Sequence, residues 1–186
     1  TGLSFQVMES SSTEILVTGG EITDTNWHHV ALVKQGNTSD STYTLYKDGV
    51  SVGAVTDSDT FTQSRWLGIG GNSDGGDYFD GSMDGIRISD SARYTAAFDP
   101  PTTAFSNDGN TLLLVQSGTD GSQTFTDSSS NSHSITANGN VCWFAPKIGA
   151  GALFCKSSTS SSYLISDSPD FDIGTGDFTL EGYVKF

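Results

Sequence analysis

The sequence predicts an all-β protein in which two antiparallel sheets pack face to face as a sandwich. Short segments of alternating apolar and polar residues recur along the chain between clusters of Gly, Ser, Asn and Asp, and this period of two is typical of strands with one buried face. The composition is rich in Ser, Thr and Gly and poor in Glu, Lys and Arg, which favours strands and turns over helices. The pair Asp48-Gly49 lies between two alternating segments and is a hairpin signal, because both residues tolerate positive φ.

The first half of the chain shows the alternation repeatedly. Strands are expected at 3–7, 15–17, 27–34, 43–47, 50–54 and 86–88. The segment 89–94 that follows can form at most one helical turn, and it leads to Pro100-Pro101. A proline pair cannot continue a helix or a central strand, so it ends this part of the structure.

The second half begins with an apolar strand at 111–115 and ends with another at 178–186. Between them, 141–144 and 152–155 are expected to form a hairpin around a Pro- and Gly-containing connection. Cys142 and Cys155 flank this hairpin. They can form a disulfide if they face each other across it, and the alternative is two free thiols.

Several motifs carry a resemblance to a known fold. They are Trp27-His28-His29-Val30-Ala31-Leu32-Val33, Tyr46-Lys47-Asp48-Gly49-Val50, Leu67-Gly68-Ile69-Gly70-Gly71 and Phe79-Asp80-Gly81-Ser82-Met83-Asp84-Gly85-Ile86-Arg87-Ile88. Together they resemble the second half of a laminin-G-like, concanavalin A-type jelly roll. The tail, 163–186, resembles the first half of the same fold, although it comes later in the chain.

This order leaves two interpretations of the domain organisation. Residues 1–105 match the C-terminal portion of a module and residues 106–186 match the N-terminal portion. The two portions belong either to one circularly permuted domain or to adjacent repeats of a tandem array. The first and last strands of this jelly roll are neighbours, so the resemblance implies that 111–115 lies beside 86–88. The family usually has one further strand between the segments that match 178–186 and 3–8.

Charge excludes some classes of partner. The formal net charge is −14 and the pI is about 4.1, which repels a phosphate backbone, and there is no basic stripe to overcome that repulsion. Nucleic-acid binding is therefore not expected. The chain has no apolar run of the length that spans a bilayer, and residues 1–20 lack the pattern of a signal peptide. Membrane insertion is not expected either.

A calcium site is the sharpest metal prediction. The segment 126–133 resembles the family's Asp-x-Ser-Gly-Asn loop, and Asp84 stands where the family carries an acidic residue. The resemblance implies that Asp84, Asp127 and Asn131 supply oxygen ligands, together with nearby carbonyls, as calcium requires. Two departures weaken the match, because Ser130 replaces a glycine and Gly85 replaces a second acid. The alternative is an Asx-type turn with solvated carboxylates.

Catalysis is not expected. The same jelly roll hosts retaining glycosidases, which need two carboxylates about 5 Å apart, typically from a Glu-x-Asp-x-Glu strand. The glutamates of this chain are Glu9, Glu14, Glu21 and Glu181, and they form no such motif. No Gly-x-Ser-x-Gly elbow or Cys/His arrangement is present. The sequence therefore predicts a protein that is not an enzyme.

Glycan binding is the expected function. Candidate ligand residues are Asp77, Tyr78, Tyr94 and Tyr163, which combine aromatic rings with polar loops, whereas aromatic residues more often belong to the core. The sequence style resembles tandem modules of bacteriophage tail fibres, other virion appendages and bacterial adhesins. That resemblance implies an extracellular or virion-surface adhesion module that binds a cell-surface polysaccharide. The alternative is a structural spacer or decoration module that contacts neighbouring copies of the same fibre protein.

Overall fold

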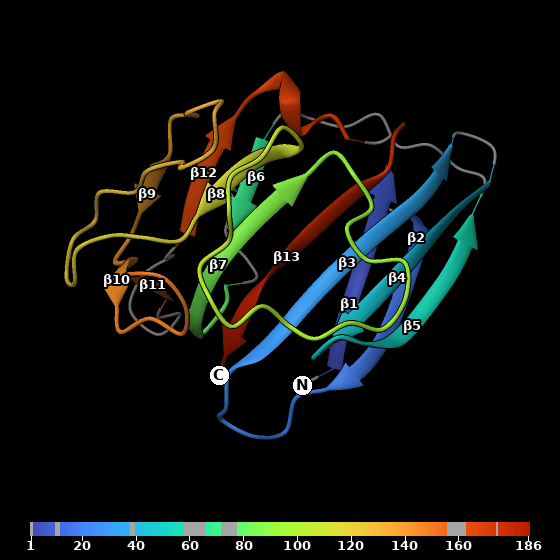
Figure 1. The fold of residues 1–186 in the computed structure, drawn as a ribbon, viewed down its shortest axis with the longest axis horizontal. Coiled ribbons are helices and arrows are strands. Elements are labelled where there is room, and N and C mark those ends of the chain that lie inside the picture. The colour runs from blue at the N-terminus through green and yellow to red at the C-terminus, as the bar shows by residue number, and fades with distance from the viewer. Residues whose placement is uncertain are drawn as a thin grey trace.

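The computed structural model describes residues 2–9, 12–37, 40–57, 66–71, 78–155, 163–173 and 175–186. Its main layer is an eight-stranded antiparallel sheet in the order β10-β11-β7-β13-β3-β4-β5, in which β8 also pairs with β7 (Figure 1). These strands are β3 (His28–Asn37), β4 (Asp40–Lys47), β5 (Val50–Asp57), β7 (Gly81–Ser89), β8 (Thr111–Val115), β10 (Cys142–Phe144), β11 (Ala152–Cys155) and β13 (Phe178–Lys185).

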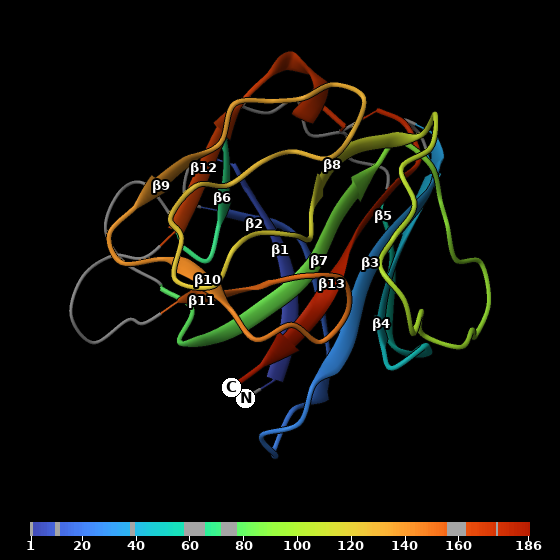
Figure 2. The same cartoon turned by 60° about the vertical axis from the view of Figure 1, so that its left-hand side comes forward.

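The second layer consists of two smaller sheets that lie on one side of the large sheet (Figure 2). One is the pair β1 (Gly2–Glu9) and β2 (Ser12–Glu21), and the other has the order β6-β12-β9, with β6 (Trp66–Ile69), β12 (Tyr163–Asp167) and β9 (Thr136–Asn138). The one helical element among the described residues is a 3-10 turn, η1 (Pro169–Phe171), so none of the described helices is long and apolar enough to cross a membrane. The all-β, two-layer prediction is confirmed.

The large sheet contains strands from both portions of the chain, and β13 of the second portion is inserted between two strands of the first. β13 lies between β3 and β7, where Leu180 is opposite Leu32 on one side and Ile88 on the other. β8 pairs with the end of β7, and Leu113 lies opposite Ile88. The predicted neighbourhood of 111–115 and 86–88 is therefore confirmed.

The Asp48-Gly49 hairpin is also confirmed, and it is held by a close contact. Asp48 has φ 50° and Gly49 has φ 78°, which is the left-handed region that a tight turn between β4 and β5 requires. The amide of Phe98 donates to the carbonyl of Gly49 at 3.0 Å. A Cβ on residue 49 would lie 1.7 Å from the carbonyl oxygen of Phe98, so only glycine fits here.

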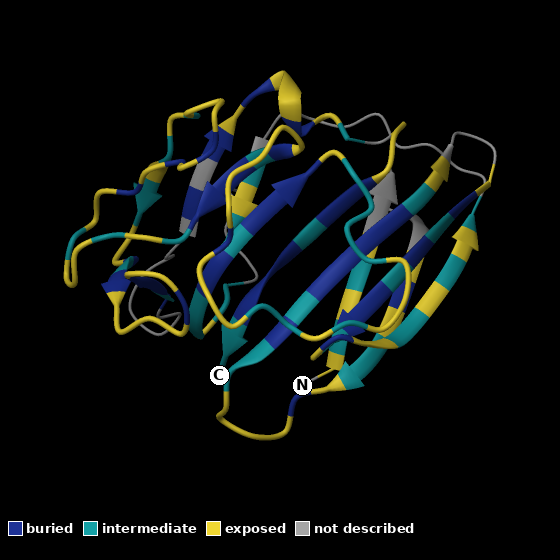
Figure 3. Cartoon of the chain, in the orientation of Figure 1, coloured by how far each residue is buried: buried dark blue, intermediate teal, exposed yellow. Residues whose placement is uncertain are grey.

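The main core lies between the layers (Figure 3). At its centre, the fully buried Trp143 packs at 4.9 Å from the ring of Phe125 and donates its indole N–H to the carbonyl of Thr124 at 2.8 Å. Gly118 and Gly151 lie against this indole, where an added Cβ would clash. The burial of Trp143 agrees with the expectation that aromatic residues more often belong to the core.

The predicted hairpin is present as β10 and β11, and its register decides the cysteine question. Cys142 lies directly opposite Phe154. Successive residues of a strand point to opposite faces, so Cys155 points to the face away from Cys142. Both thiols are free.

Candidate functional site

The outer face of the large sheet, away from the second layer, is partly covered by residues 90–110, which we call the covering segment (Figure 1). Its Tyr94 and Phe98 stack on each other at 3.6 Å and pack against an apolar patch of β3 and β4. Within the segment, the Arg93 guanidinium makes two hydrogen bonds to the Asp108 carboxylate, at 2.8 and 2.9 Å, and the backbone amide of Arg93 donates to the hydroxyl of Thr179 on β13 at 2.9 Å. The guanidinium of Arg93 holds the pKa of Asp108 well below its usual range.

A buried polar network lies beneath the covering segment. The carboxylate of Glu181, on β13, accepts hydrogen bonds from Arg87 at 2.8 Å and from the hydroxyl of Tyr94 at 2.7 Å, and it lies 3.2 Å from the ring nitrogen of His29. Burial alone would raise the pKa of Glu181, but His29, Arg87 and Tyr94 outweigh it and hold that pKa below its usual value. The guanidinium of Arg87 also lies over the ring of Phe105, 4.3 Å from its centroid.

The structure places two of the four residues that the sequence predicts for glycan binding, Tyr94 and Tyr78. Tyr94 has its hydroxyl bonded to Glu181 and its ring stacked on Phe98, so its polar group points inward rather than to solvent. Tyr78 is half-buried and lies just before β7. Asp77 and the side chain of Tyr163 lie outside the described residues. The structure brings none of the described candidates together into a shared sugar site.

The loop that carries Asp127 and Asn131 caps the free edge of β8. The carboxylate of Asp127 accepts the amides of Leu114 at 2.9 Å, Ser129 at 2.8 Å and His133 at 2.9 Å. The side-chain amide of Asn131 donates to the carbonyl of Leu112 at 3.1 Å. Asp127 and Asn131 thus satisfy backbone groups of β8 that would otherwise lack partners.

Asp84 anchors a different loop. Fully buried on β7, it accepts the amides of Gly85, Lys147 and Ile148 at 2.7, 2.7 and 2.6 Å. These bonds fix the 145–150 loop on the outer face, where Ile148 packs beside Tyr183. A Cβ at residue 85 would lie 2.7 Å from Ile148, so the glycine that departs from the family pattern makes room for this loop.

Both aspartates therefore face backbone N–H groups, which stabilise a carboxylate without a cation. The amides that donate to Asp84 come from different residues than the amides that donate to Asp127. In the parts of the chain that the structure describes, no group of three or more His, Cys, Asp or Glu residues is placed to hold a metal ion. The two carboxylates anchor two separate loops through backbone amides, and they do not lie together as the oxygen ligands of one calcium ion would.

The burial of Asp84 predicts an unusual pH dependence. Desolvation outweighs the three N–H groups and raises the pKa of Asp84 from 3.8 to about 6. A carboxyl with a raised folded-state pKa contributes stability that is complete below its unfolded pKa and is lost as the pH rises through the folded value. We therefore expect this group to lower the free energy of unfolding by about 2 kcal/mol as the pH rises from 4 to 7.

Urea titrations across this pH range, on the wild type and on Asp84→Asn, check this expectation. The variant is expected to be less stable than the wild type at low pH, because its amide nitrogen cannot accept a hydrogen bond from a backbone N–H. Its free energy of unfolding is also expected to lack the part of the pH dependence that Asp84 contributes. Parallel stability curves for the two proteins would contradict it.

An exposed aromatic groove lies at the end of the outer face near the C-terminus. It has a volume of about 360 Å³ and is lined by four aromatic residues and a few other groups, including one lysine and one serine. The lining includes Trp27, Ser82, Phe144, Phe154, Lys185 and Phe186. Its most accessible large ring is Phe144, which is 55% exposed. Volumes of a few hundred Å³ with an apolar lining and a few polar groups are typical of small-ligand sites.

Strand register builds this aromatic groove. Ser82 lies opposite Phe154 on one side and opposite Lys185 on the other, and directly opposed residues share a face. Phe144 lies two residues after Cys142, the partner of Phe154, and therefore on that same face. The rings of Phe144 and Phe154 are 5.9 Å apart. The Asp84-anchored loop supplies the neighbouring wall through Pro146.

Sequence reasoning missed this aromatic groove, although one signal was available. Phe144 and Phe154 occupy the strand positions that alternate with the buried Trp143 and Leu153. Two aromatic residues at outward positions of one hairpin indicate an exposed patch. The contribution of Trp27 and Phe186 depends on the three-dimensional arrangement and carries no comparable pattern.

The fold places the chain in a structural class: a jelly-roll sandwich, here with an aromatic groove at one end of the outer face of its large sheet. The sequence model described as the concanavalin A-like lectin/glucanases superfamily matches residues 1–97. The match covers more than half of the chain, and the chain belongs to that superfamily. Comparisons with curated proteins and with solved structures give no match.

Proposed function

We propose that this protein is a non-catalytic adhesion module that binds a neutral glycan in the aromatic groove. The observation that carries the proposal is the exposure of Phe144 above a groove that also contains Trp27, Phe154 and Phe186. Flat apolar rings offer stacking surfaces to the apolar faces of sugar rings, and the nearby hydroxyl of Ser82 and ammonium of Lys185 offer hydrogen bonds. Superfamily membership is consistent with carbohydrate binding.

The charge of the chain supports a neutral ligand. A net charge of −14 disfavours polyanionic glycans at long range. Among the described residues that line the aromatic groove, Lys185 is the one that carries a positive charge, so it can orient a ligand without reversing this field. We place the module on an extracellular or virion surface, with a cell-surface polysaccharide as its partner.

The proposed binding is without turnover. Among the glutamates whose side chains the structure describes, Glu181 is buried and bonded to Arg87, and Glu21 lies on the exposed face of β2. Glu181 is committed to the network beneath the covering segment, which supports an architectural role. A structural spacer that contacts neighbouring copies is the second candidate, and the inward placement of Tyr94 and Trp143 favours it.

Glycan-array screening tests the proposed function. A single module is expected to bind weakly, because a shallow groove buries little surface, and a multimerised form is expected to give a clear signal through avidity. Neutral glycans are expected to exceed sulfated or sialylated ones. No signal from the multimer, together with firm self-association, would overturn the glycan proposal and leave the spacer as the better account.

Calcium binding stays a prediction from the sequence. If it occurs, calcium raises the melting temperature by mass action and Asp127→Ala removes the increase. Because this substitution also removes bonds to β8, the readout is the difference between melting curves in calcium and in chelator for each protein. Equal curves for the wild type in the two conditions would contradict a calcium site.

A further inference from the structure

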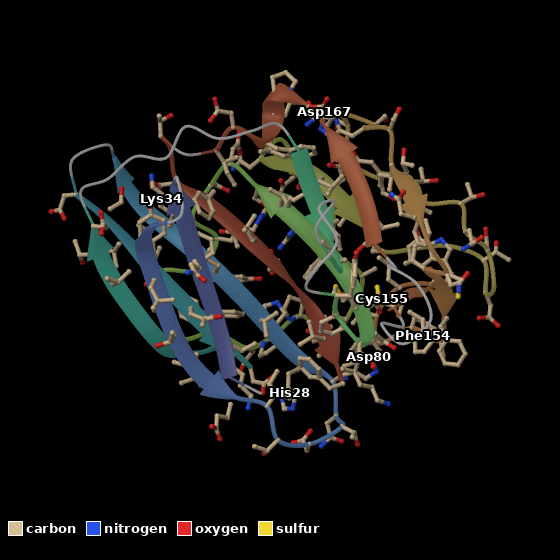
Figure 4. The ribbon with its side chains drawn as sticks, turned by 180° about the vertical axis from the view of Figure 1, so that it is seen from behind. His28, Lys34, Asp80, Phe154, Cys155 and Asp167 are labelled. Carbon is tan, nitrogen blue, oxygen red and sulfur yellow. The ribbon has the colours of Figure 1, made fainter. Side chains whose placement is uncertain are left out.

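His28 joins three segments at the end of the molecule that carries the aromatic groove. Its Nδ1 lies 2.7 Å from Oδ2 of Asp48, in the turn between β4 and β5, and its Nε2 lies 3.1 Å from Oδ1 of Asp24, in the loop between β2 and β3. In Figure 4, His28 lies at the start of β3, next to that loop. The imidazole is 12% exposed, so solvent screens these contacts less than at an open surface. We call His28, Asp24 and Asp48 together the His28 clamp.

The His28 clamp needs an imidazole that carries two protons. A neutral imidazole has one N–H, whereas both ring nitrogens of His28 face a carboxylate oxygen. The hydrogen bond to Asp48 raises the pKa of His28 above its usual 6.5; desolvation opposes this rise, and the bond to Asp24 adds to it. The doubly protonated ring, which donates to both aspartates, is therefore the form present in mild acid.

Loss of the second proton breaks the contact with Asp24 rather than the contact with Asp48. Asp48 has the shorter contact with the ring, and its Oδ1 also accepts the backbone amide of His29 at 3.0 Å. Asp24 is exposed and has the longer contact. When Nε2 of His28 loses its proton, its lone pair faces the carboxylate of Asp24, so the two groups repel each other.

The neighbouring charged groups do not replace the lost proton. The ammonium of Lys47, on β4, donates to the carbonyl of Glu21 at 2.6 Å. On β13, the apolar Val184 lies opposite His28, and the next residue, Lys185, lines the aromatic groove instead. The charges that act on the His28 ring are those of the two aspartates of the clamp.

The His28 clamp reaches the aromatic groove through Trp27. Trp27 directly precedes His28, lines the groove and packs against the cluster that contains Tyr183 and Ile148. Residues 23–26 are exposed, so they have little packing of their own, and the contact between Asp24 and His28 ties them to β3. Release of Asp24 therefore loosens the loop at its junction with Trp27.

We propose that the His28 clamp is a pH-operated control on the aromatic groove, which fixes the Trp27 wall in acid and loosens it when His28 becomes neutral. A fixed wall loses less conformational freedom when a ligand binds. Glycan affinity is therefore expected to be higher in acid. This effect on affinity rests on the proposed function, whereas the change in the wall is a property of the protein without ligand.

Nuclear magnetic resonance on the full chain without ligand tests the wall. Between pH 5.5 and 9, we expect the ¹⁵N order parameter of the Trp27 indole to fall from about 0.85 to about 0.6 or less. The midpoint is expected to coincide with that of the His28 ring shifts. His28→Gln cannot titrate and is expected to abolish the fall, whereas His133→Gln, which removes another histidine near a carboxylate, is expected to keep it.

Two groups near the wall require a further comparison. Asp84 has a pKa of about 6 and anchors the loop that forms the neighbouring wall of the aromatic groove. It remains in His28→Gln, so any fall that persists in this variant belongs to Asp84 or to another group. In Asp24→Asn, the amide can either accept from or donate to Nε2 of His28, so the contact survives in both states of the ring. This variant is expected to lower the pKa of His28 and to hold the Trp27 order parameter constant.

A neutral-glycan array tests the effect on affinity. The multimerised wild type is expected to give a signal at pH 5.5 about threefold stronger than at pH 8.5, on the scale of one partly exposed ion pair. For His28→Gln, the ratio of the two signals is expected to be smaller by the same factor.

The outcomes separate the clamp from the proposed function. An order parameter that stays constant through the His28 midpoint, or that falls equally in His28→Gln, would overturn the proposal. Equal glycan signals at both pH values from a protein whose wall titrates would overturn the control of affinity. A wall that titrates as expected, with no glycan signal at either pH, would support the clamp and count against glycan binding.

Discussion

Glu181→Ala is expected to destabilise the protein by about 3–5 kcal/mol, because it leaves the buried guanidinium of Arg87 without its partner. The same change removes the acceptor of the Tyr94 hydroxyl and the contact with His29. Since Tyr94 belongs to the covering segment and Glu181 to β13, the loss falls on the attachment of that segment to the large sheet. Urea denaturation followed by fluorescence measures the change in free energy of unfolding.

Two controls separate this network from a general effect of losing an acid. Glu21→Ala, at an exposed position on β2, is expected to change stability by no more than about 0.5 kcal/mol. The pKa of Glu181 is lowered from 4.5 in the folded state. The contribution of Glu181 to the free energy of unfolding is therefore complete at pH values above 4.5 and is lost as the pH falls. The gap between wild type and variant is therefore expected to narrow in acid, and a gap that is small at pH 7 would contradict the described network.

Trp143→Ala is the second large effect, with an expected loss of about 3–5 kcal/mol. Its indole is fully buried and donates a hydrogen bond to the carbonyl of Thr124. Gly118 and Gly151 lie against the indole and have no side chains to fill the cavity that the substitution leaves. Phe144→Ala, one residue later but exposed, is the matched control and is expected to stay within about 0.5 kcal/mol of the wild type. Equal losses for the two variants would contradict the assignment of inward and outward positions on β10.

The fold could be predicted from the sequence because its signals are local. Alternation at 43–47 and 50–54 and the tolerance of Asp48-Gly49 for positive φ define a hairpin without reference to the rest of the chain. Local patterns could not predict the pairing of β8 with β7, because the covering segment separates residues 86–88 from residues 111–115. The family resemblance supplied that long-range contact.

The candidate site was less predictable, because it depends on which side chains the register brings together. Tyr94 combines an aromatic ring with a hydroxyl, as ligand-binding residues often do. Its hydroxyl instead donates a hydrogen bond to Glu181, a buried carboxylate 87 positions away in the sequence. Asp84 and Asp127 match acidic positions of a family motif, yet each is surrounded by amides from a distant loop or strand. The aromatic groove combines β7, β10, β11 and β13 with Trp27, and no single segment reveals it.

The most direct test of the central claim compares three multimerised proteins on one neutral-glycan array: wild type, Phe144→Ala and Val50→Ala. Val50 is a matched control because it is an equally exposed apolar residue, at 59%, on β5 at the opposite edge of the large sheet. The account predicts a signal for the wild type and for Val50→Ala, and a loss of about tenfold or more for Phe144→Ala, as for removal of a stacking contact worth 1.4 kcal/mol. Signals of equal strength for all three proteins would contradict the aromatic groove as the glycan site.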